Sequence, residues 1–369
     1  SAGYAHIGYY DRANDDIKYA FQTENGWQFQ VIASDASSSC GGISALMLDE
    51  GGNPHISYGG DSLHYAHLVY NTWQMIKIVD EGTNIYGPSL ALDSQGLPHI
   101  SYGVREACGP YPSDLRYAYM DTQGWQIETV STWAGSGSLV IDANDRPHIS
   151  YIVDSPMYIG SLQYGFRDDG GWKIETVPGI HDFMSISLAV DRDGFPHISY
   201  IVNHVKSYGA DLMYAYLDEA AWQTSTVVAN YEGEVLSTSI TLDEVGDPHI
   251  SYLNYISDPE NTYLMYTSWE AYGWDFQTVD ENGGDIGKYN PLVLDSKDKP
   301  HISYTINEGL KYVRRENSHW HTQSVGSEVD GTSKSSIDLD LDDYPHISYS
   351  RSRYGLMYAY LDDSGWHTQ

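Results

Sequence analysis

A five-residue motif, Pro-His-Ile-Ser-Tyr, recurs along this chain and constrains its fold more than any other feature of the sequence. It occurs at 54–58, 98–102, 147–151, 196–200, 248–252, 300–304 and 345–349, and a degenerate copy, Ala-His-Ile-Gly-Tyr, occupies 5–9. The histidines of the eight copies are His6, His55, His99, His148, His197, His249, His301 and His346. Their successive spacings are 49, 44, 49, 49, 52, 52 and 45 residues. A period in this range indicates an array of repeated supersecondary units.

The letters inside one repeat indicate four strands. The repeat that begins near 88 contains the runs SLALD, PHISY, LRYAY and WQIETV, which alternate apolar and polar residues and are bounded by Gly, Pro, Asp or Ser. Such runs are typical of short β-strands, and no segment of the chain keeps a helical period. Four antiparallel strands per repeat, named A to D here in chain order, form the blade of a β-propeller. The sequence therefore predicts an all-β, eight-bladed β-propeller.

We expect residues 1–369 to form a single propeller domain. The expected blades cover about 1–33, 42–79, 88–131, 138–178, 185–229, 237–280, 290–326 and 335–369. Strand A occurs only seven times, first around 43–48, and the sequence ends at 365–369 within a strand D. The first blade is thus expected to lack its inner strand and the last blade to be truncated. Three alternatives follow: the chain continues beyond Gln369, the first blade lacks its inner strand, or a partner strand fills the gap. The third alternative means assembly, because an open strand edge favours pairing with another strand.

The two ends of the expected blades differ in character. The A–B turns are nearly constant, as in LDSQGLP and LDEGGNP, and the C–D turns are short. The B–C and D–A connections vary widely in length and sequence. Up-and-down connectivity places the constant turns at one end of each blade, called the uniform end here, and the other connections at the variable end. Function on a repeat scaffold is expected where the repeats differ.

The repeated histidines are expected to be structural. Period-two geometry places His55 and Ser57 on one face of strand B. Tryptophans follow the C–D turn at the same end: Trp27, Trp73, Trp125, Trp172, Trp222, Trp274, Trp320 and Trp366. Aspartates end strand A there: Asp49, Asp93, Asp142, Asp191, Asp243 and Asp295, with Asp340 or Asp342 in the last repeat. A buried imidazole needs partners for both nitrogens, and these residues supply them.

Eight equivalent copies argue against a metal or catalytic role for these histidines, because blade-equivalent residues do not converge. The tyrosines of the L-x-Y-A-Y strand, such as Tyr65, Tyr117, Tyr214 and Tyr358, are expected to pack between blades.

Three resemblances follow from these motifs. The gathering of Asp, His, Ser and Trp resembles the structural network of WD-repeat propellers, although the GH…WD signature is missing. Repeats reading LDSxGNPHISY…LxYA…GW…ETV resemble those of secreted bacterial and archaeal proteins, which implies a propeller outside the cytoplasm. The Y-x-D-x-x-G-W turns at 119–125 and 360–366 resemble the Asp-box of sialidases and related lectins. Their spacing departs from S-x-D-x-G-x-T-W, and no arginine triad for a carboxylate sugar accompanies them.

The charge balance limits the partners. The chain has 51 Asp and Glu against 19 Lys and Arg, a formal charge of −32. Such a surface repels nucleic acid and anionic lipid. No apolar stretch approaches the roughly 18 residues of a membrane-spanning helix. The first residues, Ser1 to Gly3, suit a secretory protein whose signal peptide has been removed. Cys40 and Cys108 form either a single disulfide or two unpaired thiols.

Aromatic residues of the variable-end loops are the candidate ligand contacts, since exposed rings with polar tips suit sugars and protein partners. They are Tyr86, Tyr111, Trp133, Tyr158, Tyr208, Tyr231, Tyr255, Tyr263, Tyr289 and Tyr354. Titratable groups in the same loops provide material for an enzyme, and some propellers are polysaccharide lyases that use His, Tyr and Arg. These groups are Arg105, Glu106, His181, Asp182, His204 and Lys206. The acidic loop 191–196 is a weak candidate calcium site and lacks the length of an EF-hand.

The sequence thus predicts a secreted or surface-attached scaffold that binds a glycan or a protein through its Tyr-rich loops. One alternative is a carbohydrate-active enzyme, either a polysaccharide lyase or a glycoside hydrolase, at the same end. A second alternative is a subunit of a surface layer or filament with strand exchange at the incomplete blade.

Overall fold

The computed structural model describes most of the chain. The described residues are 4–11, 13–34, 44–79, 84–105, 113–153, 160–179, 182–204, 209–230, 233–256, 262–281, 290–306, 309–327, 334–351 and 355–369. They form strands and turns, and among them there is no helix that could cross a membrane. The chain divides into two compact units, Ser1–Ile180 and His181–Gln369.

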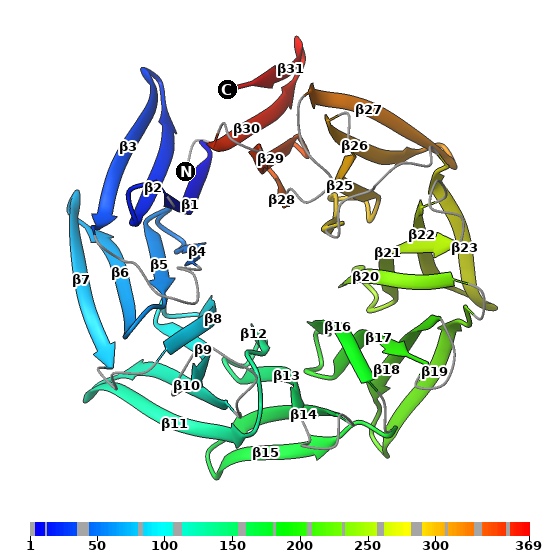
Figure 1. Ribbon diagram of the computed structural model, residues 1–369, viewed down its shortest axis with the longest axis horizontal. Coiled ribbons are helices and arrows are strands. Elements are labelled where there is room, and N and C mark those ends of the chain that lie inside the picture. The colour runs from blue at the N-terminus through cyan, green and yellow to red at the C-terminus, as the bar shows by residue number, and fades with distance from the viewer. Residues whose placement is uncertain are drawn as a thin grey trace. The chain divides into compact units, whose positions relative to one another are not determined.

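The first unit contains four antiparallel sheets with their strands in chain order (Figure 1). Its strands are β1 His6–Asp11, β2 Asp16–Thr23, β3 Gly26–Ala33, β4 Ser44–Leu48, β5 Pro54–Tyr58, β6 Leu63–Val69, β7 Thr72–Val79, β8 Asn84–Leu92, β9 Pro98–Arg105, β10 Asp114–Asp121, β11 Gly124–Thr132, β12 Ser138–Ile141, β13 Pro147–Val153, β14 Ser161–Asp168 and β15 Gly171–Thr176. The sheet β1–β3 has three strands, and the sheets β4–β7, β8–β11 and β12–β15 have four.

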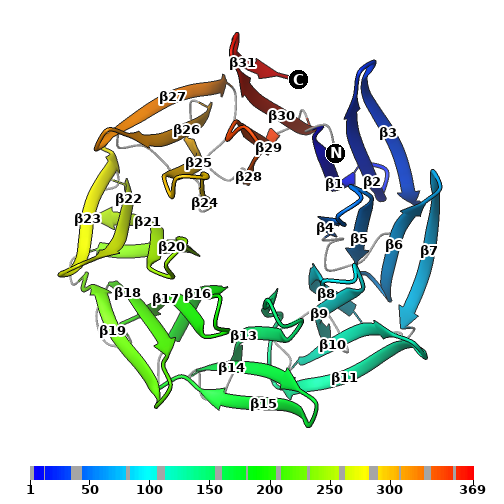
Figure 2. The same ribbon diagram turned by 180° about the vertical axis from the view of Figure 1, so that it is seen from behind.

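The second unit repeats this arrangement (Figure 2). Its strands are β16 Asp182–Val190, β17 Pro196–Asn203, β18 Ala210–Leu217, β19 Trp222–Val228, β20 Gly233–Leu242, β21 Pro248–Ile256, β22 Thr262–Glu270, β23 Gly273–Asp280, β24 Leu292–Leu294, β25 Pro300–Ile306, β26 Gly309–Glu316, β27 His319–Ser327, β28 Ser335–Leu339, β29 Pro345–Arg351, β30 Gly355–Asp362 and β31 Gly365–Thr368. A single parallel pair, Ala210 with Glu234, joins the sheets β16–β19 and β20–β23.

Every sheet is built as the repeat letters predict. In β8–β11, Leu90 of strand A pairs with Ile100 of strand B, which in turn pairs with Ala118 of strand C. These three side chains are buried and belong to one apolar cluster that also holds Leu63 and Tyr65 of the preceding sheet. In the seven sheets that contain it, the Pro-His-Ile-Ser-Tyr strand is therefore an interior strand that is paired on both sides.

The inner strands of three sheets are longer than the sequence indicates. β8, β16 and β20 start at Asn84, Asp182 and Gly233, whereas the expected blades begin at 88, 185 and 237. Each has a register shift near its start, between Tyr86 and Ser89 in β8 for example. A bulge interrupts the period of two, so alternation alone does not show that the strand continues.

The end sheets match the strand count read from the repeats. The first sheet begins at β1, a strand B, and has no strand A among the described residues. The last sheet has four strands, of which the outermost, β31, spans only Gly365–Thr368.

Neighbouring sheets of one unit are joined by a repeated aromatic contact. A strand C tyrosine meets the strand D tryptophan of the next sheet edge-on, with ring centroids 5.1 to 5.3 Å apart. In Tyr19–Trp73 the indole also donates to Gln30 Oε1 of the first sheet at 2.5 Å. Of the strand C tyrosines expected to pack between sheets, Tyr65, Tyr117 and Tyr214 do so.

Candidate functional site

The uniform end of each complete sheet is built around one aspartate. In β8–β11, Asp93 follows strand A, and its Oδ1 accepts hydrogen bonds from the amides of Gln95 and Leu97 at 2.9 and 2.8 Å. Its Oδ2 lies 3.5 Å from Nε2 of His99. One oxygen of this carboxylate thus stabilises the A–B turn, and the other oxygen faces the histidine of strand B.

The same carboxylate–imidazole contact occurs in seven sheets, at 3.2 to 3.7 Å. The pairs are Asp49–His55, Asp93–His99, Asp142–His148, Asp191–His197, Asp243–His249, Asp295–His301 and Asp340–His346. In the last sheet the partner is therefore Asp340, not Asp342. These contacts place each imidazole Nε2 beside a carboxylate.

The second imidazole nitrogen meets a tyrosine that the sequence assigns to packing alone. His148 Nδ1 lies 2.5 Å from the Tyr164 hydroxyl of strand C, and His55 Nδ1 lies 2.5 Å from that of Tyr65. Equivalent pairs exist in all eight sheets: His6–Tyr19, His55–Tyr65, His99–Tyr117, His148–Tyr164, His197–Tyr214, His249–Tyr266, His301–Tyr312 and His346–Tyr358. Six of these tyrosines contact a histidine with the hydroxyl and a tryptophan with the ring: Tyr19, Tyr65, Tyr117, Tyr214, Tyr266 and Tyr312.

Among the described residues, Ser101 and Trp320 form their hydrogen bonds outside this network, so the expected Asp–His–Ser–Trp grouping does not hold for them. Ser101 Oγ donates instead to the Gly137 carbonyl near the next sheet, at 3.2 Å. Trp320 Nε1 donates to Gln277 Oε1 of the preceding sheet at 2.9 Å. The observed unit is Asp–His–Tyr, and serine and tryptophan connect one sheet to the next.

Burial sets the charge state of the network. Desolvation lowers the pKa of His99 and His148, and the nearby aspartates Asp93 and Asp142 only partly oppose this effect. Desolvation also raises the pKa of Tyr164. The neutral imidazole then accepts from the tyrosine at Nδ1. Its Nε2 faces the carboxylate, although in His99 and His148 this atom makes no hydrogen bond within the described residues.

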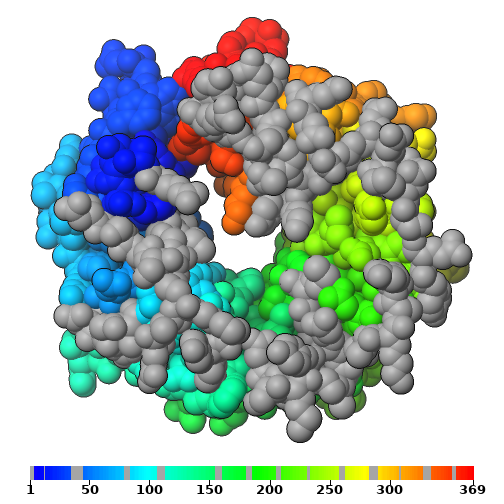
Figure 3. Space-filling view, in the orientation of Figure 1, coloured from blue at the N-terminus to red at the C-terminus, as the bar shows by residue number. Residues whose placement is uncertain are grey.

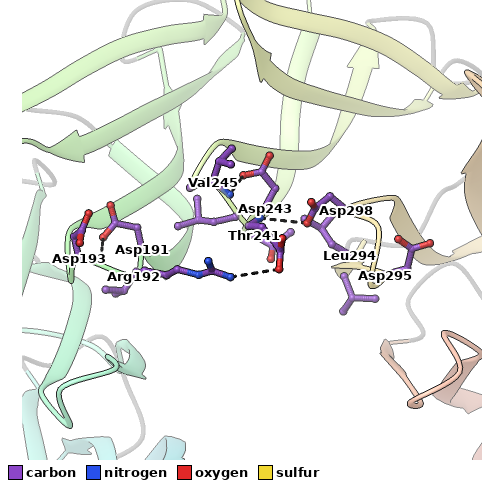
Figure 4. A pocket seen from close by; sticks show the side chains of 14 residues that line it. Asp191, Arg192, Asp193, Thr241, Asp243, Val245, Leu294, Asp295 and Asp298 are labelled. Carbon is purple, nitrogen blue, oxygen red and sulfur yellow. Dashed lines mark hydrogen bonds and ion pairs between the residues drawn. The ribbon is translucent and has the colours of Figure 1, made fainter.

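A hollow of about 730 Å³ lies at the uniform end of the second unit (Figure 4). Its walls are the A–B turns of three successive sheets, including Asp191, Asp243 and Asp295. Arg192 lies 3.5 Å from Glu244 across the hollow, and both side chains are exposed. The aspartates that line this hollow are the turn residues already described, so its acidity comes from the repeat.

No group of three or more His, Cys, Asp or Glu side chains suited to a metal occurs among the described residues. The expected calcium loop, 191–196, is a turn in which Asp191 Oδ1 accepts from the amides of Asp193 and Phe195 at 3.0 and 2.8 Å. Asp191 Oδ1 thus accepts hydrogen bonds from backbone amides of the loop itself.

The variable end of β8–β11 presents one tryptophan on a fixed backbone. Ala134 is fully buried; its amide donates to the Ser113 carbonyl at 2.8 Å, and its carbonyl accepts from Ser113 Oγ at 2.8 Å. The preceding residue, Trp133, has φ of 61°, and its side chain is 45% exposed. A bulky residue in left-handed conformation is uncommon and persists only where the surroundings determine it. The hydrogen bonds of Ala134 constrain the backbone beside Trp133 in this way, and the Trp133 side chain remains partly exposed.

Tyr86 at the same end is packed down rather than free. Its hydroxyl donates to Ser113 Oγ at 2.8 Å, and the Arg105 guanidinium lies 4.0 Å from the centre of its ring. The ring rests on Gly103, where an added Cβ would lie 2.5 Å from Tyr86 Cζ.

Gly103→Ala is therefore expected to displace the Tyr86 ring and to lower the unfolding free energy by about 1–3 kcal/mol, since overpacking strains a fixed site. Gly135→Ala is the matched control, because an added Cβ there lies 3.9 Å from the Tyr86 hydroxyl. Urea unfolding followed by tryptophan fluorescence measures both variants. Equal stabilities would show that the Tyr86 ring yields without cost.

The variable end of the second unit carries polar groups that differ from sheet to sheet. His204 Nε2 lies 3.0 Å from Asp211 Oδ1, which also accepts from the Asn230 amide at 2.9 Å. The Asn230 side chain donates to Asn254 Oδ1 at 2.6 Å and so links two sheets. Carboxylate, imidazole and amide groups therefore lie together between β16–β19 and β20–β23.

The next sheets differ again. Asp280, at the end of β23, is buried and lies 2.8 Å from Lys311 Nζ, and it also accepts from the Tyr304 hydroxyl. Burial, followed by the hydrogen bond to Asp280, raises the pKa of Tyr304. Tyr255 and Tyr263, both expected ligand contacts, are half-buried on paired strands β21 and β22. The structure thus places Tyr255 and Tyr263 on strands and leaves Trp133 as the most exposed of the four expected contacts it describes.

The remaining expected residues lie outside the described part of the chain. They are Tyr111, Tyr158, Tyr208, Tyr231, Tyr289, Tyr354, Glu106, His181, Lys206, Cys40 and Cys108, together with the side chain of Asp182.

Comparisons with known proteins identify the fold. No protein-family model matches this sequence, and no curated protein matches it. Among solved structures, the chain is similar to an ulvan lyase, described as a new family of polysaccharide lyase and bound to -[GlcA(1-4)Rha3S]-, with a TM-score of 0.61 and 13% identity. The match covers 87% of this chain and 92% of that one. A puromycin hydrolase matches with a TM-score of 0.57 and 10% identity, over 98% of this chain and 58% of that one.

At these identities the likeness shows the fold alone. The ulvan lyase is a β-propeller, and the four-stranded antiparallel sheets described above are the blades of such a fold. The chain is a β-propeller protein.

Proposed function

We propose that this protein is a carbohydrate-active β-propeller of eight blades that acts outside the cytoplasm and binds a polysaccharide at the variable ends of its blades. The observation that carries the proposal is Trp133, whose side chain is 45% exposed and whose backbone is followed by a buried, doubly hydrogen-bonded residue, Ala134. A rigid exposed aromatic ring suits the apolar face of a sugar, and it loses little conformational entropy on binding.

The polar groups of the second unit support the same ligand class. Asp211, Asn230 and Asn254 offer carboxylate and amide groups whose positions are already fixed by hydrogen bonds. Preorganised polar groups orient a hydroxyl-rich ligand at small entropic cost. The ulvan lyase with a similar fold was solved with a saccharide bound, which agrees with a glycan as the ligand.

The ligand proposal is tested by Trp133→Ala, with polysaccharide binding followed by calorimetry after a glycan-array screen. We expect the affinity to fall about tenfold, because loss of one stacked ring corresponds to roughly 1.4 kcal/mol. Trp269→Ala is the matched control, since Trp269 is 43% exposed but lies near the C–D turn, at the uniform end of its sheet. An equal loss in both variants, or no loss in either, would contradict a glycan site at the variable end.

Polysaccharide cleavage is a second candidate, favoured by the His204–Asp211 pair at 3.0 Å. A lyase needs a base to remove the proton beside a uronate carboxylate, and a carboxylate on the far side of an imidazole orients such a base. The assay follows the ultraviolet absorbance of an unsaturated uronate product. His204→Gln is expected to abolish product formation and leave binding intact. If the unchanged protein binds polysaccharide but releases no product, binding alone is its function.

A further inference from the structure

The first sheet has one strand edge that no described residue pairs with. Its strand B, β1, pairs with β2 on one side only. The strand B of each other sheet pairs on both sides, as β9 does with β8 and β10. The described residues of this sheet reach the surface in dark blue in Figure 3. An edge of this kind presents unpaired backbone donors and acceptors.

The side chain of Ile7 on β1 is also less covered than its equivalents in the other sheets. Ile7 is 8% exposed, whereas its equivalents in the other sheets are all 0% exposed: Ile56, Ile100, Ile149, Ile198, Ile250, Ile302 and Ile347. In those sheets an apolar residue of strand A pairs with this isoleucine, as Leu90 does with Ile100. Ile7 thus lacks the apolar neighbour that covers its equivalents.

The Asp–His–Tyr unit of this sheet is also incomplete. His6 Nδ1 lies 2.5 Å from the Tyr19 hydroxyl, as in every other sheet. In the other seven sheets an aspartate that follows strand A lies 3.2 to 3.7 Å from the histidine Nε2. No described carboxylate makes this contact with His6. The missing strand and the missing carboxylate belong to the same segment in every complete sheet.

We propose that the open edge of β1 binds an extended peptide of the chain's own strand A type that ends in an aspartate. The register of β8 on β9 defines the pairing: Leu90 opposite Ile100, Ala91 opposite His99 and Leu92 opposite Pro98, followed by Asp93. By equivalence, a leucine lies opposite Ile7, the next residue opposite His6, and an aspartate three residues after that leucine contacts His6 Nε2. This site is separate from the proposed glycan site and does not depend on it.

Backbone pairing and the aspartate have different consequences. Addition of a strand to a sheet edge supplies affinity through main-chain hydrogen bonds and accepts many sequences. The carboxylate supplies selectivity, because a histidine held by Tyr19 offers one N–H to one acceptor at a fixed place. A bound peptide without the aspartate leaves this half-buried donor unpaired.

The test uses the full chain and a synthetic peptide with the sequence of residues 89–97, SLALDSQGL. We expect saturable binding, and hydrogen exchange measured by NMR should show new protection of β1 amides. A peptide with asparagine in place of Asp93 should bind about tenfold more weakly, since a charge-assisted hydrogen bond exceeds a neutral one by that order. In the His6→Gln variant the two peptides should bind alike.

Three outcomes overturn the proposal. Binding without protection of β1 places the peptide elsewhere on the protein. Equal affinity for the Asp93 and asparagine peptides in the unchanged protein removes the role of His6. Protection of β1 that grows with protein concentration in the absence of peptide assigns the edge to a second copy of the chain.

Discussion

Replacement of His148 by alanine is expected to lower the free energy of unfolding by about 2–4 kcal/mol. The imidazole is 1% exposed, and it lies 2.5 Å from the Tyr164 hydroxyl and 3.2 Å from Asp142 Oδ2. Truncation removes a packed ring and leaves a buried hydroxyl without its partner, so a cavity cost and a desolvation cost add. Urea unfolding, followed by circular dichroism, measures the change.

The control for this variant is His319→Ala, because His319 is exposed and its Nδ1 lies 3.0 Å from the carbonyl of the nearby Asn317. Its stability should remain within about 0.5 kcal/mol of the unchanged protein. Polysaccharide affinity per folded molecule should be unaltered in both variants, since the histidines lie at the uniform ends of the blades. A fully stable His148→Ala protein that no longer binds ligand would show that the repeated histidines are functional instead.

Much of the fold follows from the sequence because each repeat agrees with its structure at every level. The Pro-His-Ile-Ser-Tyr segments are strands β5, β9, β13, β17, β21, β25 and β29, each flanked by the strands that its repeat predicts. The turn aspartates are equally predictable from the sequence, since Asp93 lies at a constant sequence position relative to the strands that its turn connects. Local patterning and short-range hydrogen bonds are enough to specify these features.

The second partner of each histidine, the strand C tyrosine, cannot be predicted from the sequence in this way. Tyr164 and His148 meet because strands B and C pair in a register that places Ser150 opposite Tyr164. The paired His and Tyr are separated by 10 residues in one repeat and by 18 in another, so the register follows from the packing of the sheet and not from the spacing of residues. The alternation of the L-x-Y-A-Y strand shows only that the tyrosine faces inward.

The candidate site shows the same limit. The sequence places Tyr86 and Trp133 together as loop aromatics, yet the structure seats one against Gly103 and exposes the other. The difference comes from the fully buried Ala134 and its two hydrogen bonds with Ser113. Neither bond leaves a periodic signal, because both join segments 21 residues apart that do not repeat.

The protein is expected to lose stability as the pH falls from about 7.5 to 5.5. Burial lowers the pKa of six deeply buried histidines below the 6.5 of an exposed imidazole: His55, His99, His148, His197, His249 and His301. Between the folded and unfolded pKa values the unfolded chain binds more protons, so the free energy of unfolding rises with pH in this window. The stabilisation is complete above about pH 6.5 and is lost below it, at no more than about 1.4 kcal/mol per pH unit for each histidine. Urea midpoints at three pH values measure the slope.

A competing effect has the opposite sign. The formal charge is −32 and the isoelectric point is about 4.5, so acidification reduces repulsion between surface carboxylates and thereby stabilises the folded chain. Salt distinguishes the effect of the buried histidines from the effect of the surface charge. At about 0.15 M salt the Debye length is near 8 Å, so repulsion between exposed charges is screened, whereas the cost of protonating a buried imidazole is not. We therefore expect the loss of stability on acidification to be steeper at 0.15 M salt than at low salt. A stability that rises on acidification at both salt concentrations would mean that the buried histidines accept protons without cost, which the Asp–His–Tyr geometry does not allow.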